Sequence, residues 1–223
     1  MSLSDVAWLL AGNLAMVVAV MTLLWGVAVR IRDVSFIDAV WPMAMLFLAL
    51  VTWPRTEGDA LRSALLVGLC VAWALRLGVH LFLRWRAHGE DRRYTDLIGR
   101  QMKTGKSWPT VALLFVFLPQ AVLAWLTSLP VQLGQVADAP AVGWLGWAGV
   151  ALFVVGLAFE TIGDAQLAAF RRDPSTKGQV LDTGLWRYTR HPNYFGDACV
   201  WWGLYLIAAE TGPGLASILG PIF

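Results

Sequence analysis

The residues best suited to chemistry lie in the segment Gly184–Asp197, where cations, aromatics and amides are concentrated at the entry to an apolar run. Pro192 fits the first turn of a helix, where its missing N–H costs nothing, and His191 is therefore the expected cap. Free N–H groups in such a turn attract anions, and Arg187 and Arg190 just before it suit bidentate phosphate contacts. We predict a phosphate or pyrophosphate group at this helix start.

Ionisable residues also recur at helical spacing inside the apolar runs. Glu160 and Asp164 are four residues apart, so they share a helix face where their like charges repel unless a cation or a hydrogen-bonding ligand lies between them. Ionisable side chains in membrane segments are costly and point to function. We predict that three such faces open onto one cavity. Their members are Glu160, Asp164 and Arg171 on one run, Arg76 and His80 on another, and Asn193, Asp197 and Trp201 on a third.

The elements that position these residues are predicted to be apolar helices. The 223 residues are 58% hydrophobic and 14% charged, whereas an average soluble domain is about 25% charged. A helix needs ~20 apolar residues to cross a membrane, and no alternating pattern suggests a barrel. We predict one domain, residues 1–223, forming an all-α polytopic transmembrane bundle. The expected spans are Val6–Val29, Phe36–Trp53, Leu61–Leu83, Trp108–Leu129, Val142–Phe170 and Pro192–Ala209, with the start of a seventh at Leu215–Phe223.

The basic residues predict the orientation of this bundle. The loops after the first, third and fifth spans hold 14 of the 17 Lys and Arg residues, and basic loops stay on the cytoplasmic side. The N-terminus is therefore expected outside, and the polar cavity is expected to face the cytoplasm. For the long basic loop after the third span, contact with lipid headgroups alone is an alternative to a role in the site.

Several other kinds of site are not supported by the sequence. Cys70 and Cys199 lie in apolar runs and are expected to behave as small buried hydrophobic residues. The chain has no CxxC or Cys/His cluster, so no metal site is predicted. It has neither a GxGxxG after a strand nor a P-loop motif. A net charge of only +2 argues against a nucleic-acid partner.

Longer motifs resemble a known family. Gly184–Asp197, followed by the Trp-Trp-Gly of residues 201–203, resembles the C-terminal signature of the steroid 5-alpha-reductase-like membrane proteins, especially their bacterial branch, many of whose members have no assigned substrate. Phe159–Leu167 and Leu118–Gln120 resemble the same group, and the similarity extends from about Arg76 onward. The resemblance implies a seven-helix bundle in the bacterial inner membrane. It also implies that the cytosolic half binds NADPH and that a carbon–carbon double bond conjugated to a carbonyl is reduced.

Matching the family position by position implies roles for individual residues. Residues 142–170 and 171–223 would form the cofactor region, in which Asp164 and Asn193 orient the nicotinamide or ribose and Arg171 contacts phosphate. These matched residues, the polar helix faces and the arginine-rich loop together give the residues predicted to bind the cofactor. They are Arg76, Glu160, Asp164, Arg171, Arg187, Tyr188, Arg190, His191, Asn193, Tyr194 and Asp197.

The catalytic positions depart from the family pattern. The family polarises its steroid carbonyl with a Glu–Tyr pair. In this chain Asp38 takes the place of the glutamate, and no tyrosine lies in the second or third span to take the place of the family's tyrosine. His80 is the substitute proton donor, because an unperturbed imidazole pKa near 6.5 suits proton transfer. The predicted catalytic residues are therefore Asp38 and His80.

Two other functions stay open on sequence alone. S-adenosylmethionine-dependent methyltransferases of the isoprenylcysteine and phospholipid type share a related Arg-His-Pro-x-Tyr signature, although Asn193 and Asp197 match the reductases better. A non-enzymatic lipid- or sterol-binding membrane protein is the other alternative. The expected partners are membrane lipids and a lipid-like small molecule, and a steroid, a quinone, a fatty enone and another isoprenoid fit equally.

Overall fold

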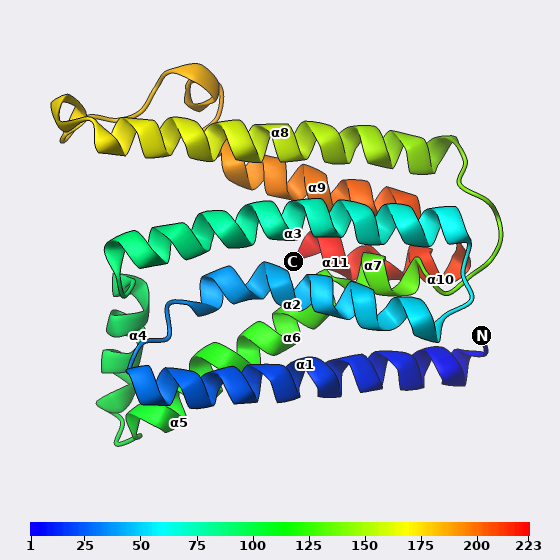
Figure 1. Ribbon diagram of the computed structural model, residues 1–223, viewed down its shortest axis with the longest axis horizontal. Coiled ribbons are helices and arrows are strands. Elements are labelled where there is room, and N and C mark those ends of the chain that lie inside the picture. The colour runs from blue at the N-terminus through cyan, green and yellow to red at the C-terminus, as the bar shows by residue number, and fades with distance from the viewer.

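All 223 residues are placed in the computed structural model, and every regular element is a helix. The long helices run side by side in a bundle (Figure 1). Five are long and apolar enough to cross a membrane, which confirms the predicted all-α, membrane-spanning class. They are α1 (Leu3–Ile31), α2 (Ile37–Thr52) with the turn that follows it, α3 (Ala60–His88), the segment Trp108–Thr127, and α8 (Trp144–Arg172).

The C-terminal part differs from the predicted pattern of spans. The sixth expected span is α9 (Pro192–Ala208), which has only 17 residues. It is short because the loop of residues 173–191 folds back beside α8, so that α9 starts inside the bundle (Figure 1). The apolar residues after it form short helices, α10 (Gly212–Leu215) and α11 (Leu219–Ile222), which pack back on the bundle against α7 (Leu129–Leu133).

A proline explains an irregular turn in the fourth apolar helix. Pro119 has no N–H and its ring crowds the preceding turn. The chain accordingly passes from α5 (Trp108–Ala112) through a π-helical turn, Leu113–Phe117, into α6 (Leu118–Thr127). Such π turns accommodate a backbone that cannot continue the regular hydrogen-bond ladder.

Glycines spaced seven residues apart bring α8 and α9 into close contact. A Cβ added at Gly156 would lie 2.5 Å from the carbonyl oxygen of Gly196, and a Cβ at Gly149 would lie 2.5 Å from that of Gly203. Small residues allow helix backbones to approach in this way within a membrane. The close contact brings the start of α9 beside the polar face of α8.

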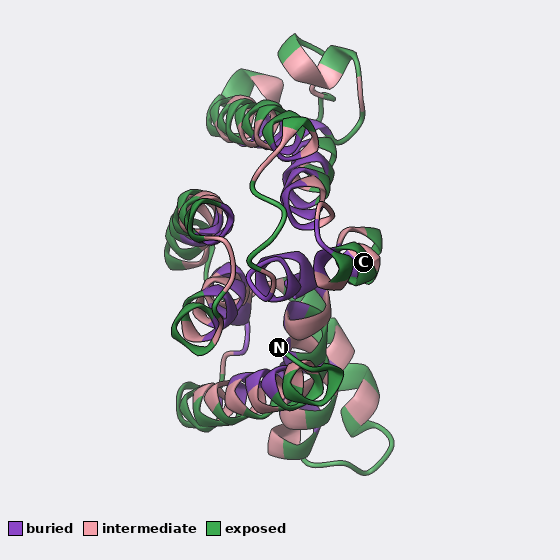
Figure 2. Ribbon diagram, turned by 90° about the vertical axis from the view of Figure 1, so that its right-hand side faces the viewer, coloured by how far each residue is buried: buried purple, intermediate pink, exposed green.

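Buried residues lie on the faces of the helices that turn toward one another, and exposed residues lie on the outward faces (Figure 2). Trp73, Phe117 and Phe153 are among the largest fully buried side chains. Large apolar residues such as Trp8 and Trp144 are instead exposed on the outside, at 77% and 81%. Outward apolar side chains on this scale fit a bundle surrounded by lipid.

Two buried polar clusters fasten the end of the bundle that holds the N-terminus. Asn13 of α1 donates hydrogen bonds to Thr52 and Gln132 at 2.8 Å each. On the other side, the Glu210 carboxylate accepts the N–H groups of the first turn of α8 and lies 3.8 Å from the fully buried Arg62. Buried polar groups that satisfy one another in this way fix the register of the elements that carry them.

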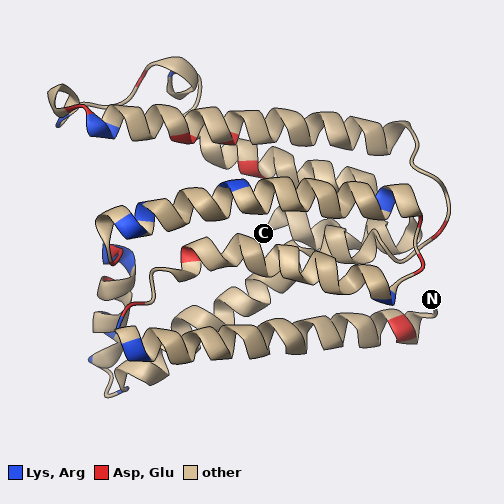
Figure 3. Ribbon diagram, in the orientation of Figure 1, with Lys and Arg blue, Asp and Glu red and all other residues tan.

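Most Lys and Arg residues gather at the other end, which we call the basic end of the bundle (Figure 3). Helix α4 (Arg92–Met102) lies across this end, roughly at right angles to the long helices (Figure 1). The clustering agrees with the alternation of basic loops in the sequence. The polar site described below opens toward the same end.

The glycine contacts between α8 and α9 give a stability prediction. Gly156→Leu would force a side chain against the backbone of α9, and we expect it to lower the free energy of unfolding by about 3 kcal/mol. Gly26→Leu is the matched control, because a Cβ at this helical glycine meets nothing within 4 Å. The measurement is chemical or thermal unfolding in detergent, and equal effects of the two substitutions would contradict the close contact.

Candidate functional site

A half-buried arginine, Arg76, joins α3 to α8 at the centre of the polar region. The Nη1 atom of Arg76 lies 2.7 Å from Glu160 Oε1, and its Nη2 atom lies 2.5 Å from Asp164 Oδ2. Nη2 also donates to the backbone carbonyl of Glu160 at 2.7 Å. The two carboxylate side chains are only 4% and 10% exposed. Arg76 is therefore the shared cation that the like-charged helix face required.

Helix α9 completes this polar cluster. The Asn193 amide donates to Asp164 Oδ1 at 3.1 Å, and the Trp73 indole N–H donates to Asp197 Oδ1 at 3.1 Å. Trp73 also packs edge-on against Trp201, with ring centroids 5.0 Å apart. The three polar faces expected from sequence spacing, on α3, α8 and α9, thus meet in one place.

A second carboxylate, on α2, is paired with a tyrosine that the sequence analysis missed. The Tyr94 hydroxyl donates to Asp38 Oδ1 at 2.5 Å. Tyr94 belongs to α4, so no search of the second and third spans could find it. Asp38 sits in the first turn of α2, and Pro42, four residues later, removes the N–H that would bond its backbone carbonyl.

Two arginines hold the Asp38 carboxylate on its other side. Asp38 Oδ2 lies 2.9 Å from Arg93 Nη2 and 3.4 Å from Arg84 Nη2. Arg93 also bonds Asp91, which caps the first turn of α4, and this hydrogen bond is the main cause of the lowered pKa of the Asp91 carboxyl. Burial, followed by the nearby Asp38 charge, raises the pKa of Tyr94 above its ordinary value of 10.0. Tyr94 thus remains a neutral hydrogen-bond donor.

Three hollows adjoin one another at the basic end and share parts of their walls. The inner hollow, about 390 Å³, includes Asp38, Glu160, Asp164 and Asn193 in its lining. The middle hollow, about 440 Å³, shares Asp38, Leu81, Arg84, Arg93 and Tyr194 with it. The outer hollow, about 980 Å³, shares Arg171 with the middle one. The three hollows thus lie in order between the buried acids and the exposed end of α8.

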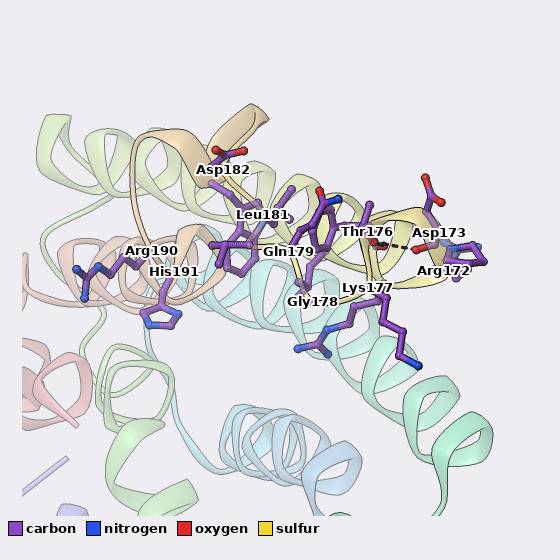
Figure 4. Close-up of a pocket in the computed structure, with 16 residues that line it drawn as sticks. Arg172, Asp173, Thr176, Lys177, Gly178, Gln179, Leu181, Asp182, Arg190 and His191 are labelled. Atoms are coloured by element: carbon purple, nitrogen blue, oxygen red, sulfur yellow. Dashed lines mark hydrogen bonds between the residues drawn. The ribbon is translucent and has the colours of Figure 1, made fainter.

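The outer hollow lies between the end of α8 and the loop of residues 173–191 (Figure 4). The loop is fastened to α8 by two hydrogen bonds of 3.0 Å, from the Trp186 indole to the Gly163 carbonyl and from the Leu185 N–H to Gln166 Oε1. Gly184 has φ 60°, and a Cβ there would lie 2.3 Å from the Gln166 side chain. Glycine is therefore required at this crossing.

The predicted site residues fall into four groups by position. Asp38, His80, Glu160, Asp164, Asn193, Tyr194 and Asp197 line the inner hollow. Arg76 binds its acids, and His80 Nε2 is 3.6 Å from Asp164 Oδ2. Arg171, Arg190 and His191 line the outer hollow, and His191 is the N-cap of α9 as expected. Arg187 and Tyr188 are exposed and line none of the three hollows.

The inner hollow contains buried polar atoms without a partner. Glu160 Oε2 and the Trp41 indole N–H are both buried and make no hydrogen bond, and both residues line this hollow. An unsatisfied buried acceptor and donor are costly. No side chain of the protein satisfies either atom, so each keeps an open hydrogen-bonding valence next to this hollow.

Comparisons with known proteins identify relatives but no characterised activity. Residues 24–223 match the family described as "Protein of unknown function (DUF1295)". The "Uncharacterized protein C594.04c" of Schizosaccharomyces pombe is 23% identical over 216 residues, which cover 86% of this chain and 62% of the relative. The chain thus spans less than two thirds of that relative's length. No solved structure matches it significantly.

Removing the central arginine tests the polar cluster. Arg76→Met leaves two buried carboxylates without their cation, and we expect a loss of about 3–5 kcal/mol in the free energy of unfolding. The triple variant Arg76→Met/Glu160→Gln/Asp164→Asn should recover most of this loss, because no buried charge is left unpaired. Arg86→Met, at the exposed end of α3, controls for loss of an arginine. If the triple variant were no more stable than the single one in detergent unfolding, the ion pairs would not be the cause.

The Tyr94–Asp38 pair predicts a pH dependence at alkaline pH. Because the pKa of Tyr94 is raised in the folded protein, its stabilising effect is complete below the unfolded pKa near 10 and is lost as pH rises through the folded value. Wild type should therefore lose stability relative to Tyr94→Phe as pH rises above about 10. Unfolding measured across this range checks it, with the exposed Tyr188→Phe as control. Parallel pH profiles for wild type and Tyr94→Phe would contradict the pairing.

Proposed function

The chain belongs to this family of proteins of unknown function, and from its site we propose that it is a membrane-embedded, NADPH-dependent reductase. The substrate would be a lipid-like ketone with a carbon–carbon double bond conjugated to its carbonyl. The resemblance of Gly184–Asp197 to the steroid 5-alpha-reductase-like proteins supports the same reaction class. In this proposal the basic end faces the cytoplasm, in a bacterial inner membrane, where the cofactor is available.

The observation that carries the proposal is the series of three neighbouring hollows, in which each shares lining residues with the next. Its outer part has Arg171, Arg172 and Lys177 in its walls, and its inner part has buried acids and an asparagine. An elongated molecule with phosphates toward one end and an uncharged amide ring at the other matches this order of charges. Arginine is well suited to phosphate because its donors form a planar fork.

The polar side chains of the inner hollow would hold the ring end of such a cofactor. Glu160 Oε2 and the Trp41 indole N–H have no partner in the protein, and a carboxamide that reached them after a side-chain rotation would supply a donor and an acceptor. Asp164 and Asn193 bond each other beside them and would fix the ring or ribose. When bound, the reduced nicotinamide supplies a hydride, and the protein supplies orientation and electrostatics.

The protein's own groups would act on the ketone. Tyr94 is a neutral hydroxyl between α2 and α4 whose single proton is donated to Asp38, so it would bond a ketone oxygen only after turning away from Asp38 toward the inner hollow. Asp38 accepts two arginines and the tyrosine, so it serves to orient Tyr94 and is poorly suited to donate a proton. Arg84 and Arg93 add positive charge where an enolate oxygen would develop. His80, on the opposite wall beside Asp164, is the remaining candidate proton donor.

The walls of the inner hollow combine a few apolar side chains with many polar ones. Trp41, Leu77 and Leu81 line it, and most of its other walls carry charged or amide side chains. Small-molecule sites use placed polar groups to fix the orientation of a ligand that also makes apolar contacts. In this proposal the apolar part of the ligand would lie against Trp41, Leu77 and Leu81, and its carbonyl would lie toward the polar side chains.

Cofactor binding tests the proposal directly. Purified full-length protein should bind NADPH, measured by nicotinamide fluorescence, and Arg171→Ala should weaken binding about tenfold or more through loss of a charge-assisted phosphate contact. Arg86→Ala, which removes an exposed cation outside the hollows, should bind like wild type. Titration with S-adenosylmethionine distinguishes the methyltransferase alternative.

Two results would overturn the reductase assignment. The first is no NADPH binding by folded protein at millimolar cofactor. The second is binding of S-adenosylmethionine that NADPH cannot displace, which would favour a methyltransferase. If neither cofactor binds while lipid-like ketones do, the chain is a lipid-binding protein.

A further inference from the structure

Helix α4 has two different faces, and only one of them is explained by the site. Its inner face carries Tyr94, Leu97 and Ile98, which turn toward the bundle, and Ile98 is the one buried residue of the helix. Its outer face carries Arg92, Asp96, Gly99, Arg100 and Lys103, all exposed. The spacing of three and four residues places each set on one side of the helix.

The cations of this outer face have little internal compensation. Arg92 pairs with Asp96 at 3.6 Å, but neither Arg100 nor Lys103 has an acidic partner. The two lie around a shallow hollow of about 410 Å³ that also includes Thr95, Gly99 and Asp96, the carboxylate that Arg92 pairs with. A Cβ at Gly99 would meet nothing within 4 Å, so the hollow is open to its surroundings.

The position of α4 determines what this face meets. The helix crosses the ends of the apolar helices at the basic end, so it lies along the plane of a surrounding membrane (Figure 1). Basic residues just outside membrane spans attract anionic lipids. Phosphate is also the group that arginine and a backbone-flanked hollow bind best.

The helix also needs contacts beyond those of its inner face. It has 11 residues, whereas isolated helices shorter than ~12–15 residues are marginal in water. Gly89 and Gly105, with φ 72° and 85°, interrupt the chain on either side of it. A short helix with one buried residue would be held more firmly by a ligand on its exposed face.

We infer that the outer face of α4, where Arg100 and Lys103 lie beside Thr95 and Gly99 and where Arg92 neutralises Asp96, binds the phosphate of anionic phospholipid headgroups. This contact orders α4 and thereby holds Tyr94 against Asp38. The inference is independent of the reductase chemistry, because it concerns a lipid site and the order of a helix. It gives the protein a means of sensing the charge of the membrane that surrounds it.

Hydrogen exchange in lipid nanodiscs tests the inference without an activity assay. In wild type, amides of residues 92–102 should exchange more slowly, on the order of tenfold, in discs that contain phosphatidylglycerol than in discs of phosphatidylcholine alone. Arg100→Gln/Lys103→Gln should lose this difference. The charge-preserving Arg100→Lys/Lys103→Arg variant should keep this difference. Both residues are exposed, so all four substitutions are compatible with folding.

A second double variant tests whether the site is local. Arg30→Gln/Arg86→Gln removes two exposed cations from the same end of the bundle but outside α4, and it should keep the lipid-dependent protection. Loss of protection in this variant would assign the effect to overall charge and overturn the inference. So would equal exchange of wild type in both lipids, or protection by inorganic phosphate added to neutral discs.

Discussion

A guanidinium held between two carboxylates is the interaction on which the rest of the site depends. Arg76 reaches from α3 to Glu160 and Asp164 on α8, deep among apolar helices. Apolar contact alone gives little preference for one helix arrangement in lipid, because lipid chains are as apolar as the helix surfaces. The ion pairs of Arg76 with Glu160 and Asp164 do give such a preference, because a charge left unpaired among apolar helices is costly in any other arrangement. They therefore set both the rotation of α3 and its height against α8, and with them the position of every residue along the inner hollow.

Two types of helix contact have different consequences for the site. The glycines of α8 and α9 bring these helices into backbone contact, which leaves no room for a cavity between them and delivers Asn193 beside Asp164. Between α3 and α8 long polar side chains hold the helices together instead, and a polar hollow opens beside them toward α2. A site thus forms where the packing changes from small residues to long polar ones. The polar clusters around Asn13 and Glu210 hold the helices together at the opposite end, while the three hollows of the candidate site lie at the basic end.

The local parts of this arrangement could be predicted from sequence, and the non-local parts could not. Helical spacing indicated that Glu160 and Asp164 share a face and need a cation, because that relation involves a single helix turn. Hydropathy indicated the long spans for a similar reason, although α9 is shorter than expected because its loop returns along α8. Tyr94 was missed because it lies in a basic, weakly apolar stretch and reaches Asp38 only through a helix placed across the bundle end, 56 residues away in sequence. The outer hollow likewise depends on the path of a loop, for which the sequence offers no periodicity.

The order of charge along the hollows adds a last constraint on the ligand. On the side of α8 and α9 the inner hollow has the acids Glu160, Asp164 and Asp197, of which the first two pair with Arg76, and on the side of α2 it has Asp38 with Arg84 and Arg93. The outer hollow has Arg171, Arg172, Lys177 and Arg190 against Asp173 and Asp182. A polyanion would therefore be repelled from one end and attracted to the other, so a ligand with phosphates at one end can enter in only one direction. The uncharged end would then arrive beside Asp38 and Tyr94, where cations again prevail through Arg84 and Arg93. The charges along the hollows therefore change from basic to acidic and back to basic. This order suits a reaction in which negative charge develops on an oxygen at the wall between α2 and α4. That charge would appear next to the arginines and on the far side of the buried acids.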